Sequence, residues 1–373
     1  MKTKNSGFES LLQGNLKVSV VTQNGYKEHF ISLAFPPGTR EFDTSLAELF
    51  SYLKKTGAQA VMQLLLGGIP SKPVLIEKMK KLNGPVTWPV MAIDHDNGSH
   101  FPVSGIQVFA VSGVKLKEIN LNGEKAGFAY EDPDFEYVLL SDMRPDDTAL
   151  APGKQTREVY AKADAALKEA GMDFSRVVRT WFYLDKLLDW YKEFNDARTG
   201  CFDANGIFHK LVPASTGIGA SNPEGAALVA GFYALKPKHG EAKITKVGSP
   251  LQCEAFNYKS AFSRAVEIKT GACRKLIISG TASIDPDGKS AYIGDLDKQI
   301  ELTLKVVKEI LSSRNMDWED VTRSILYFKE QGTAPAFRKY CELNNIPAFP
   351  STVVYTTVCR EELLFEIELD AVK

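Results

Sequence analysis

The chain has 373 residues, with 45 basic and 46 acidic side chains and a formal net charge of −1. This balance argues against a protein that follows the phosphates of a nucleic acid, because such proteins carry a basic excess or a basic stripe. The composition, 44% hydrophobic and 24% charged, is that of a globular protein. The length exceeds what one hydrophobic core usually serves, so we expect two or three domains.

The N-terminal residues 1–14 read as a loose leader, because they hold no apolar stretch long enough for a secretory signal. The most apolar window, 58–69, is too short to cross a bilayer. The five cysteines are odd in number and form no CxxC pair, which argues against a disulfide framework and a structural zinc site. We therefore expect a cytoplasmic protein without a membrane partner.

The first predicted elements are a strand at 29–35, a helix at 44–56, a strand at 58–67, a helix at 72–82 and strands at 87–94 and 105–111. The same order returns with a strand at 136–142, a helix at 153–170, a strand at 175–185, a helix at 186–204 and strands at 213–219 and 226–235. Two passes in one order indicate an internal repeat.

A third pass follows a hairpin-like segment at 252–268. It consists of a strand at 275–280, a helix at 294–316, a strand at 320–330, a helix at 334–343 and strands at 350–358 and 362–372. The helix at 294–316 is predicted by apolar residues that recur every three or four positions. Two helices on one face of a mixed sheet make an α+β fold. We expect three such units, at 15–115, 116–240 and 241–373.

The third pass resembles the RidA/YjgF family, also called the endoribonuclease L-PSP family, whose units have a chorismate-mutase-like fold. The resemblance lies in ISGTASI (278–284), GDLDKQ (294–299), residues 315–321 and the closing EIELDAV (366–372). Members of this family are homotrimers of one unit. The resemblance therefore implies a pseudo-trimer within one chain, either monomeric or a weak homo-oligomer.

The deaminases of this family carry a Pro-Ala-Arg-Ser motif whose arginine binds the substrate carboxylate. Here the corresponding stretches read Pro-Ala-Phe-Pro-Ser at 347–351 and Val-Pro-Ala-Ser-Thr at 212–216, without the arginine. This departure disfavours an enamine or imine deaminase. Deamination remains one alternative, and a non-catalytic pseudo-trimer that binds a small ligand is another.

The second and third passes resemble the chorismatases more closely. The shared segments are RTWFY (179–183), FNDAR (194–198), PASTGIG (213–219), AFSRAVEI (261–268) and VCREELLFEIE (358–368). The resemblance implies an enzyme that converts chorismate to pyruvate plus a hydroxybenzoate or a dihydroxycyclohexadiene carboxylate, between the second and third units. Its partner would be a small carboxylate metabolite, chorismate or similar. We expect no cofactor and no metal.

Two residues are the candidate catalytic groups. Glu366 lies in an apolar strand, where alternation puts it on one face with Glu368, and in a partly desolvated cleft it could act as a general acid. By resemblance Glu366 is the proton donor. The pattern alone also fits two solvated carboxylates on an edge strand. Cys359 is by resemblance a candidate active-site thiol, although a lone cysteine is commonly a small buried hydrophobe.

Substrate binding is assigned to arginines and to the residues of a small-residue loop. Arg179, inside a strand and near Tyr183, needs either a substrate carboxylate or a structural acid as partner. Arg198 could face the site or the helix surface, and Arg264 precedes the strand that leads to the loop; arginine suits bidentate carboxylate binding. The predicted substrate-binding residues are Arg179, Tyr183, Arg198, Arg264, Ser279, Gly280, Thr281 and Ala282. The first unit lacks this loop and the acid-bearing last strand, so we expect a structural role for it.

Overall fold

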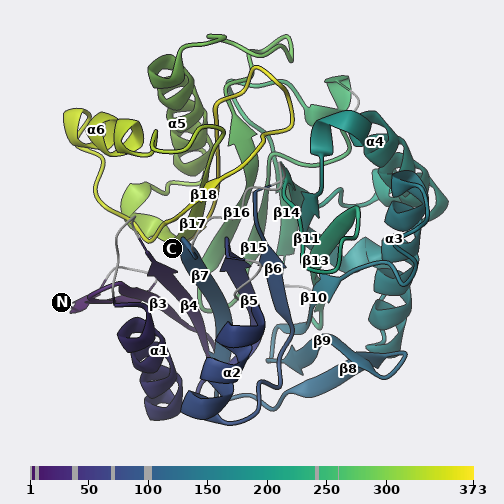
Figure 1. Ribbon diagram of the computed structural model, residues 1–373, viewed down its shortest axis with the longest axis vertical. Coiled ribbons are helices and arrows are strands. Elements are labelled where there is room, and N and C mark those ends of the chain that lie inside the picture. Colours follow the sequence, from purple (N-terminus) through teal and green to yellow (C-terminus); the bar gives the residue numbers. More distant parts are fainter. Residues whose placement is uncertain are drawn as a thin grey trace.

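A computed structural model describes residues 2–4, 8–35, 41–68, 72–95, 103–239, 243–258 and 260–373 of the chain. The described strands form three sheets in the middle of the molecule, and the helices lie around the outside (Figure 1). Each sheet with its helices is one unit. Unit 1 contains β1–β7, unit 2 contains β8–β13 and unit 3 contains β14–β19.

The elements of unit 1 are β1 (Lys2–Lys4), β2 (Glu9–Gln13), β3 (Leu16–Thr22), β4 (Lys27–Ala34), α1 (Phe42–Thr56), β5 (Gln59–Leu66), α2 (Lys72–Asn83), β6 (Val90–Ile93) and β7 (Gly105–Ser112). Unit 2 consists of β8 (Lys117–Leu121), β9 (Glu124–Glu131), β10 (Phe135–Met143), α3 (Pro152–Glu169), β11 (Val177–Leu184), α4 (Leu187–Ala204), β12 (Ala214–Gly219) and β13 (Leu228–Pro237). The helices and inner strands match the predicted elements closely.

Unit 3 consists of β14 (Lys243–Val247), β15 (Ala265–Lys269), β16 (Arg274–Ala282), α5 (Leu296–Ser312), β17 (Val321–Phe328), α6 (Pro335–Leu343), β18 (Thr352–Tyr355) and β19 (Phe365–Val372). The amphipathic pattern is realised in α5, which buries Ile300, Leu304, Val307 and Leu311 against its sheet.

One strand order describes all three sheets. It reads β2-β3-β4-β7-β5-β6 in unit 1, where β1 adds one more edge strand beside β2, then β8-β9-β10-β13-β11-β12 in unit 2, then β14-β15-β16-β19-β17-β18 in unit 3. Each unit also has a register shift near the start of the strand that follows its first helix (β5, β11 or β17), before Met62, Arg179 and Arg323 respectively. A shared order with a shared irregularity confirms the predicted fold class, a tandem of α+β units.

Two local predictions were wrong. The expected loose leader contains β2, which pairs antiparallel with β3 and so belongs to the sheet of unit 1. The expected hairpin at 252–268 is not formed: its end belongs to β15, whose partners β14 and β16 lie outside that range, and the described residues before β15 form a loop with a short 3₁₀ turn. The loop instead packs on unit 2, where Ala261 joins the core under the helices.

Each sheet buries both of its faces. One face packs on the helices of its own unit, as Phe365, Ile367 and Leu369 do in unit 3. The other faces of the three sheets share one central core, to which Met62, Tyr137 and Ile277 each contribute from a different unit. This arrangement is that of a trimer built within one chain.

The units also join edge to edge in cyclic order. The end of β6 bridges to unit 2 between Asp94 and Ser221, and β12 bridges to unit 3 between Ala214 and Ser263. The edge of β18 meets unit 1, where Gln107 Nε2 donates to the Thr352 hydroxyl at 3.1 Å and to the Ser324 carbonyl of the neighbouring β17 at 2.8 Å. At each junction, the second strand of the parallel pair of one unit (β6, β12 or β18) lies beside the central strands of the next unit. In the described part of the chain, no helix is both long and apolar enough to cross a bilayer.

Candidate active site

The last strand, β19, carries three inward-facing acids. Glu366, Glu368 and Asp370 alternate with apolar residues that pack on the helices of unit 3. The strand lies between β16 and β17, so it is not an edge strand. Glu366 is 4% exposed and Glu368 is fully buried. The alternative of two solvated carboxylates is therefore wrong.

A pocket of about 480 Å³ lies at the junction of units 2 and 3. Its size falls within the roughly 300–1,000 Å³ that is usual for small-molecule sites. Six of the ten residues predicted from the sequence line it, namely Arg198, Arg264, Gly280, Ala282, Cys359 and Glu366. They come from α4 of unit 2 and from four separate segments of unit 3, so only the packing of the two units brings them together.

Glu366 forms no ion pair with any of the residues that the structure describes. Burial and, to a smaller extent, the neighbouring Glu368 raise the pKa of its carboxyl to about 8, against the opposing effects of Arg179 and Arg264. At neutral pH this carboxyl therefore carries its proton and can donate it to a molecule in the pocket.

The backbone of Gly280 forms the surface against which Glu366 packs. A Cβ at this position would lie 2.0 Å from Glu366 Oε1, so the side chain fits only because residue 280 is a glycine. The Gly280 amide donates to the hydroxyl of Thr216 in β12 at 3.1 Å. This bond ties the glycine, and with it the surface beneath Glu366, to unit 2.

Two buried arginines face the pocket from different units. Arg198 Nη2 donates to Asn195 Oδ1 at 2.5 Å, while its Nε has no partner among the described residues. Arg264 donates through Nε and Nη2 to the Cys253 carbonyl, at 3.1 and 2.7 Å, which fixes the plane of the guanidinium. Their placement on two walls suits a molecule with two anionic groups.

Cys359 is partly exposed and also lines the pocket. Burial and, to a smaller extent, the carboxyl of Glu366 raise the pKa of its thiol to about 12, against the opposing effect of Arg360. The sulfur therefore stays protonated at neutral pH and lacks the thiolate that nucleophilic attack requires. A neutral thiol in the pocket lining suits contact with a ligand rather than nucleophilic attack.

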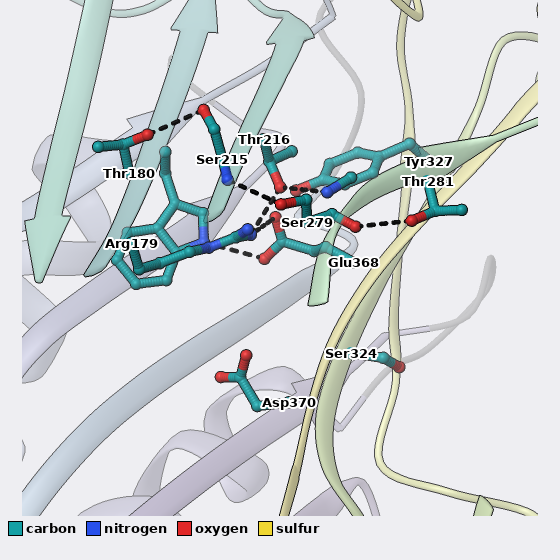
Figure 2. A network of polar contacts seen from close by, with 12 residues as sticks. Arg179, Thr180, Ser215, Thr216, Ser279, Thr281, Ser324, Tyr327, Glu368 and Asp370 are labelled. Carbon is teal, nitrogen blue, oxygen red and sulfur yellow. Dashed lines mark hydrogen bonds and ion pairs between the residues drawn. The ribbon is translucent and has the colours of Figure 1, made fainter. Parts of the chain in front are cut away.

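Arg179 and Tyr183 do not line this pocket. Both are fully buried and line a second cavity of about 80 Å³ in the centre of the molecule. Arg179 Nη2 donates to Glu368 Oε2 at 2.7 Å and to the Thr216 hydroxyl at 2.6 Å (Figure 2). Of the two partners considered for Arg179, the structure supplies the structural acid.

Ser279 and Thr281 lie behind the pocket wall. Ser279 accepts from the Ser215 amide at 2.9 Å and donates to the Ser263 carbonyl at 2.5 Å. Thr281 donates to the Ser279 carbonyl at 2.9 Å. Both hydroxyls are used within the protein, and the two bonds of Ser279 connect β16 to β12 and to the segment before β15.

Several lining residues were not anticipated as site residues from the sequence. They include Tyr191 and Asn195 on α4, Ser215 and Gly217 on β12, and Ser260 and Phe262 in the loop before β15. Asn195, Ser215, Gly217 and Phe262 lie inside the segments that resemble the chorismatases, and that was the available signal. Among the described residues, no three His, Cys, Asp or Glu side chains are grouped so as to hold a metal ion.

The fold and the pocket together define a class, a pseudo-trimer of α+β units with one buried acid and two buried arginines at a unit junction. Residues 120–232 match the family model described as "Chorismatase FkbO/Hyg5-like, N-terminal". A 3-hydroxybenzoate synthase from Streptomyces hygroscopicus is 27% identical over 276 residues, which span 66% of this chain and 77% of that protein. A chorismatase from the same species is 26% identical over 238 residues, 56% of this chain and 67% of that one.

A crystal structure of a chorismatase has the same fold. It superposes with a TM-score of 0.63 at 16% identity, over 94% of this chain and 99% of the other. The chain is thus similar to the chorismatases in sequence over part of its length and in fold over most of it, which agrees with the resemblance of the sequence segments.

Proposed function

We propose that this protein is an enzyme that releases pyruvate from chorismate. The observation that carries the proposal is the carboxyl of Glu366, which is buried at the wall of a pocket that Arg198 and Arg264 also line. The raised pKa of this carboxyl supports it as an acid. Chorismate is a dianion with an enol ether, so its cleavage needs cationic partners and an acid. The names of the relatives, chorismatase and 3-hydroxybenzoate synthase, support the same substrate.

In the proposed reaction, Glu366 gives its proton to the methylene carbon of the enolpyruvyl group. The resulting oxocarbenium ion accepts the oxygen of a water molecule, which returns a proton to the Glu366 carboxylate. The hemiketal then collapses, the ether C–O bond breaks, and pyruvate and a dihydroxycyclohexadiene carboxylate leave. If the ring rearranges instead, the products are pyruvate and a hydroxybenzoate, with no net uptake of water.

The product that we favour is the hydroxybenzoate. One relative, 27% identical to this chain over 276 residues, is named 3-hydroxybenzoate synthase. Ala282 and Cys359 lie on the pocket wall, where a small apolar side chain and a neutral thiol would contact the ring without adding charge. A ring that contacts neutral groups is less exposed to water, which favours rearrangement over hydration.

The test is to incubate the purified protein with chorismate, to measure pyruvate with a coupled lactate dehydrogenase assay, and to identify the second product by mass spectrometry. We expect pyruvate and one equivalent of an aromatic hydroxybenzoate. Pyruvate together with the dihydroxycyclohexadiene carboxylate would support chorismate cleavage and contradict the expected hydroxybenzoate product. A folded protein that releases no pyruvate would overturn the function, and ammonia release from a freshly formed imino acid would favour the deaminase instead.

A further inference from the structure

Beneath the pocket, on the same strand as Glu366, lies a layer of buried charges. Glu368 Oε1 accepts from Arg323 Nη1 at 2.9 Å and Nη2 at 2.5 Å, and from Trp181 Nε1 at 3.1 Å. Its Oε2 accepts from Arg179 at 2.7 Å. Figure 2 shows Arg179 and Glu368 facing one another across the border between units 2 and 3. Both carboxylate oxygens are thus bound by donors that cannot give up their charge or their proton.

Glu366 and Glu368 share one face of a buried strand, two positions apart, at a Cα separation of roughly 7 Å. Two carboxylates this close in a dry interior do not both ionise readily. The described guanidinium groups hydrogen-bond Glu368 and not Glu366. The geometry therefore settles which of the two carries the negative charge.

We propose that Glu368 is a positioning residue for the reaction: bound by Arg179 and Arg323 as a permanent anion, it keeps the shared proton on Glu366. This inference rests on the proposed function only in making Glu366 the proton donor. The direction of the pKa values agrees with it. Although burial raises the pKa of Glu368, Arg179 and Arg323 hold this pKa below its usual range. By contrast, burial and the charge of Glu368 raise the pKa of Glu366.

Other charged and titratable groups surround the pair. Arg264, Arg198, Arg360 and Cys359 face Glu366 from the pocket walls, and the phenol of Tyr327 lies on the strand position opposite it. Asp370 pairs with Arg323 Nε at 2.9 Å on the far side of Glu368. The groups that face Glu368 are Arg179, Arg323, Trp181, Tyr183, Tyr327 and Asp370.

The junction also couples Glu368 to Glu366 mechanically. Thr216 accepts from Arg179 at 2.6 Å and from the Gly280 amide at 3.1 Å, and Gly280 supports Glu366. The same arginine that fixes the anion therefore also fixes the backbone on which the acid rests. A neutral residue at 368 would remove the neighbouring charge and leave Arg179 and Arg323 to attract the Glu366 carboxylate.

The test follows the carboxyl carbons by 13C NMR in protein labelled at the glutamate Cδ, with assignment from Glu366→Gln. In the unaltered protein we expect Glu366 to titrate near pH 8 and Glu368 to stay ionised from pH 5 to 9. In Glu368→Gln we expect the midpoint of Glu366 to fall by at least one pH unit. The exposed Glu361→Gln, on a side chain 76% exposed, is the matched control and should leave the midpoint unchanged.

The activity profile gives a second readout. In Glu368→Gln, the alkaline limb of kcat/KM for pyruvate release should move to lower pH by the same amount, a shift that a purely structural role would not produce. An unmoved Glu366 midpoint in a folded Glu368→Gln variant would overturn the inference. If that variant does not fold, a Glu368 carbon that titrates above pH 5 in the unaltered protein overturns it instead. Absence of pyruvate release would refute the proposed function alone, because the NMR titration needs no substrate.

Discussion

The junction between units 2 and 3 and the junction between units 3 and 1 are built from corresponding strands. In the first, the Thr216 hydroxyl of β12 accepts from Arg179, which binds Glu368, and from the Gly280 amide beside Glu366. In the second, Thr352 of β18 occupies the position of Thr216. Thr216 pairs with Trp181 of β11, and Thr352 pairs with Ile325, which has the same place in β17. The comparison therefore isolates what side chains alone contribute.

The registers of the last strands give the counterparts of the two acids. In β7, Gln107 is the counterpart of Glu368 in β19. Gly105 of the same strand is the counterpart of Glu366. Gln107 donates to the Thr352 hydroxyl at 3.1 Å, and a Cβ on Gly105 would lie 3.0 Å from Thr352 Cγ2. At Gly105, β7 therefore packs directly on β18, whereas the corresponding position of the other junction holds the side chain of Glu366. A neutral amide and a glycine thus close at one junction the space that two glutamates use at the other.

The largest expected effect is that of Glu366→Gln, which removes the acid and makes the active junction resemble its neutral counterpart. General acid catalysis contributes typically 10²- to 10⁴-fold. We expect kcat for pyruvate release to fall at least 10²-fold, with KM within about threefold of the unaltered value. Steady-state kinetics at pH 7 provide the measurement, and Glu361→Gln is the control. If the variant keeps more than a tenth of the original kcat, Glu366 is not the general acid of the reaction.

The next effect concerns the arginines. A hydrogen bond to a charged group contributes about 1.5–3 kcal/mol, so we expect Arg198→Gln and Arg264→Gln each to lower kcat/KM about 10- to 150-fold, chiefly through KM. The control is Arg338→Gln, an exposed arginine on α6, the counterpart of α4 in unit 3. Equal losses in the control and the site variants would show that charge alone, rather than the pocket, determines binding.

Gly280→Ala tests the contact between the glycine and the acid. The new methyl would meet Glu366 Oε1 at 2.0 Å and push the carboxyl aside. We expect kcat/KM to fall by about tenfold or more and stability to fall by about 1–3 kcal/mol, as for overpacked sites. In the same pocket Gly217→Ala should change neither greatly, because nothing lies within 4 Å of its added Cβ. Activity and urea unfolding are measured for both variants. A loss confined to Gly280→Ala would show that displacement of Glu366 is the cause, whereas equal losses in both variants would indicate general strain of the pocket.

The pH dependence of stability follows from the raised pKa of Glu366. The folded protein keeps this proton up to about pH 8, while the unfolded chain releases it near pH 4.5. Between these values the folded state binds more protons, so this group lowers stability as pH rises, with the full loss reached above pH 8. We expect Glu366→Gln to show a higher Tm than the unaltered protein at pH 9 and a smaller difference at pH 5. Parallel Tm curves for the two proteins would contradict this.

The smallest effect is expected in unit 1. Burial lowers the pKa of His29 to about 4, and its nitrogens contact the Tyr52 and Ser112 hydroxyls at 2.7 and 2.8 Å. The unfolded chain takes up this proton near pH 6.5, so stability falls as pH drops from about 6.5 to about 4. We expect His29→Gln to flatten this part of the Tm curve and to leave pyruvate release unchanged. A change in turnover would show that unit 1 acts on the site.

The sequence alone determined the repeat, because the spacing of apolar residues distinguishes a helix from a strand without knowledge of their partners. It also placed Glu366 and Glu368 on one face, which follows from the period of a strand. The first strands of each unit were less evident: β2 is short, and β14 is largely exposed with three lysines or threonines among its five residues. The role of Glu366 came from resemblance, since alternation fits a wet face equally well.

Only the tertiary structure decided which arginine serves which acid. Arg179 and Arg264 lie on neighbouring units, and the side of a strand that faces a pocket depends on the partner sheet rather than on the strand itself. Arg179 points to the central axis and binds Glu368, while Arg264 is turned to the pocket by the Cys253 carbonyl. The charges of Glu366 and Glu368 differ for the same reason, because burial and charged neighbours set a pKa, and both are supplied by chain segments distant in sequence.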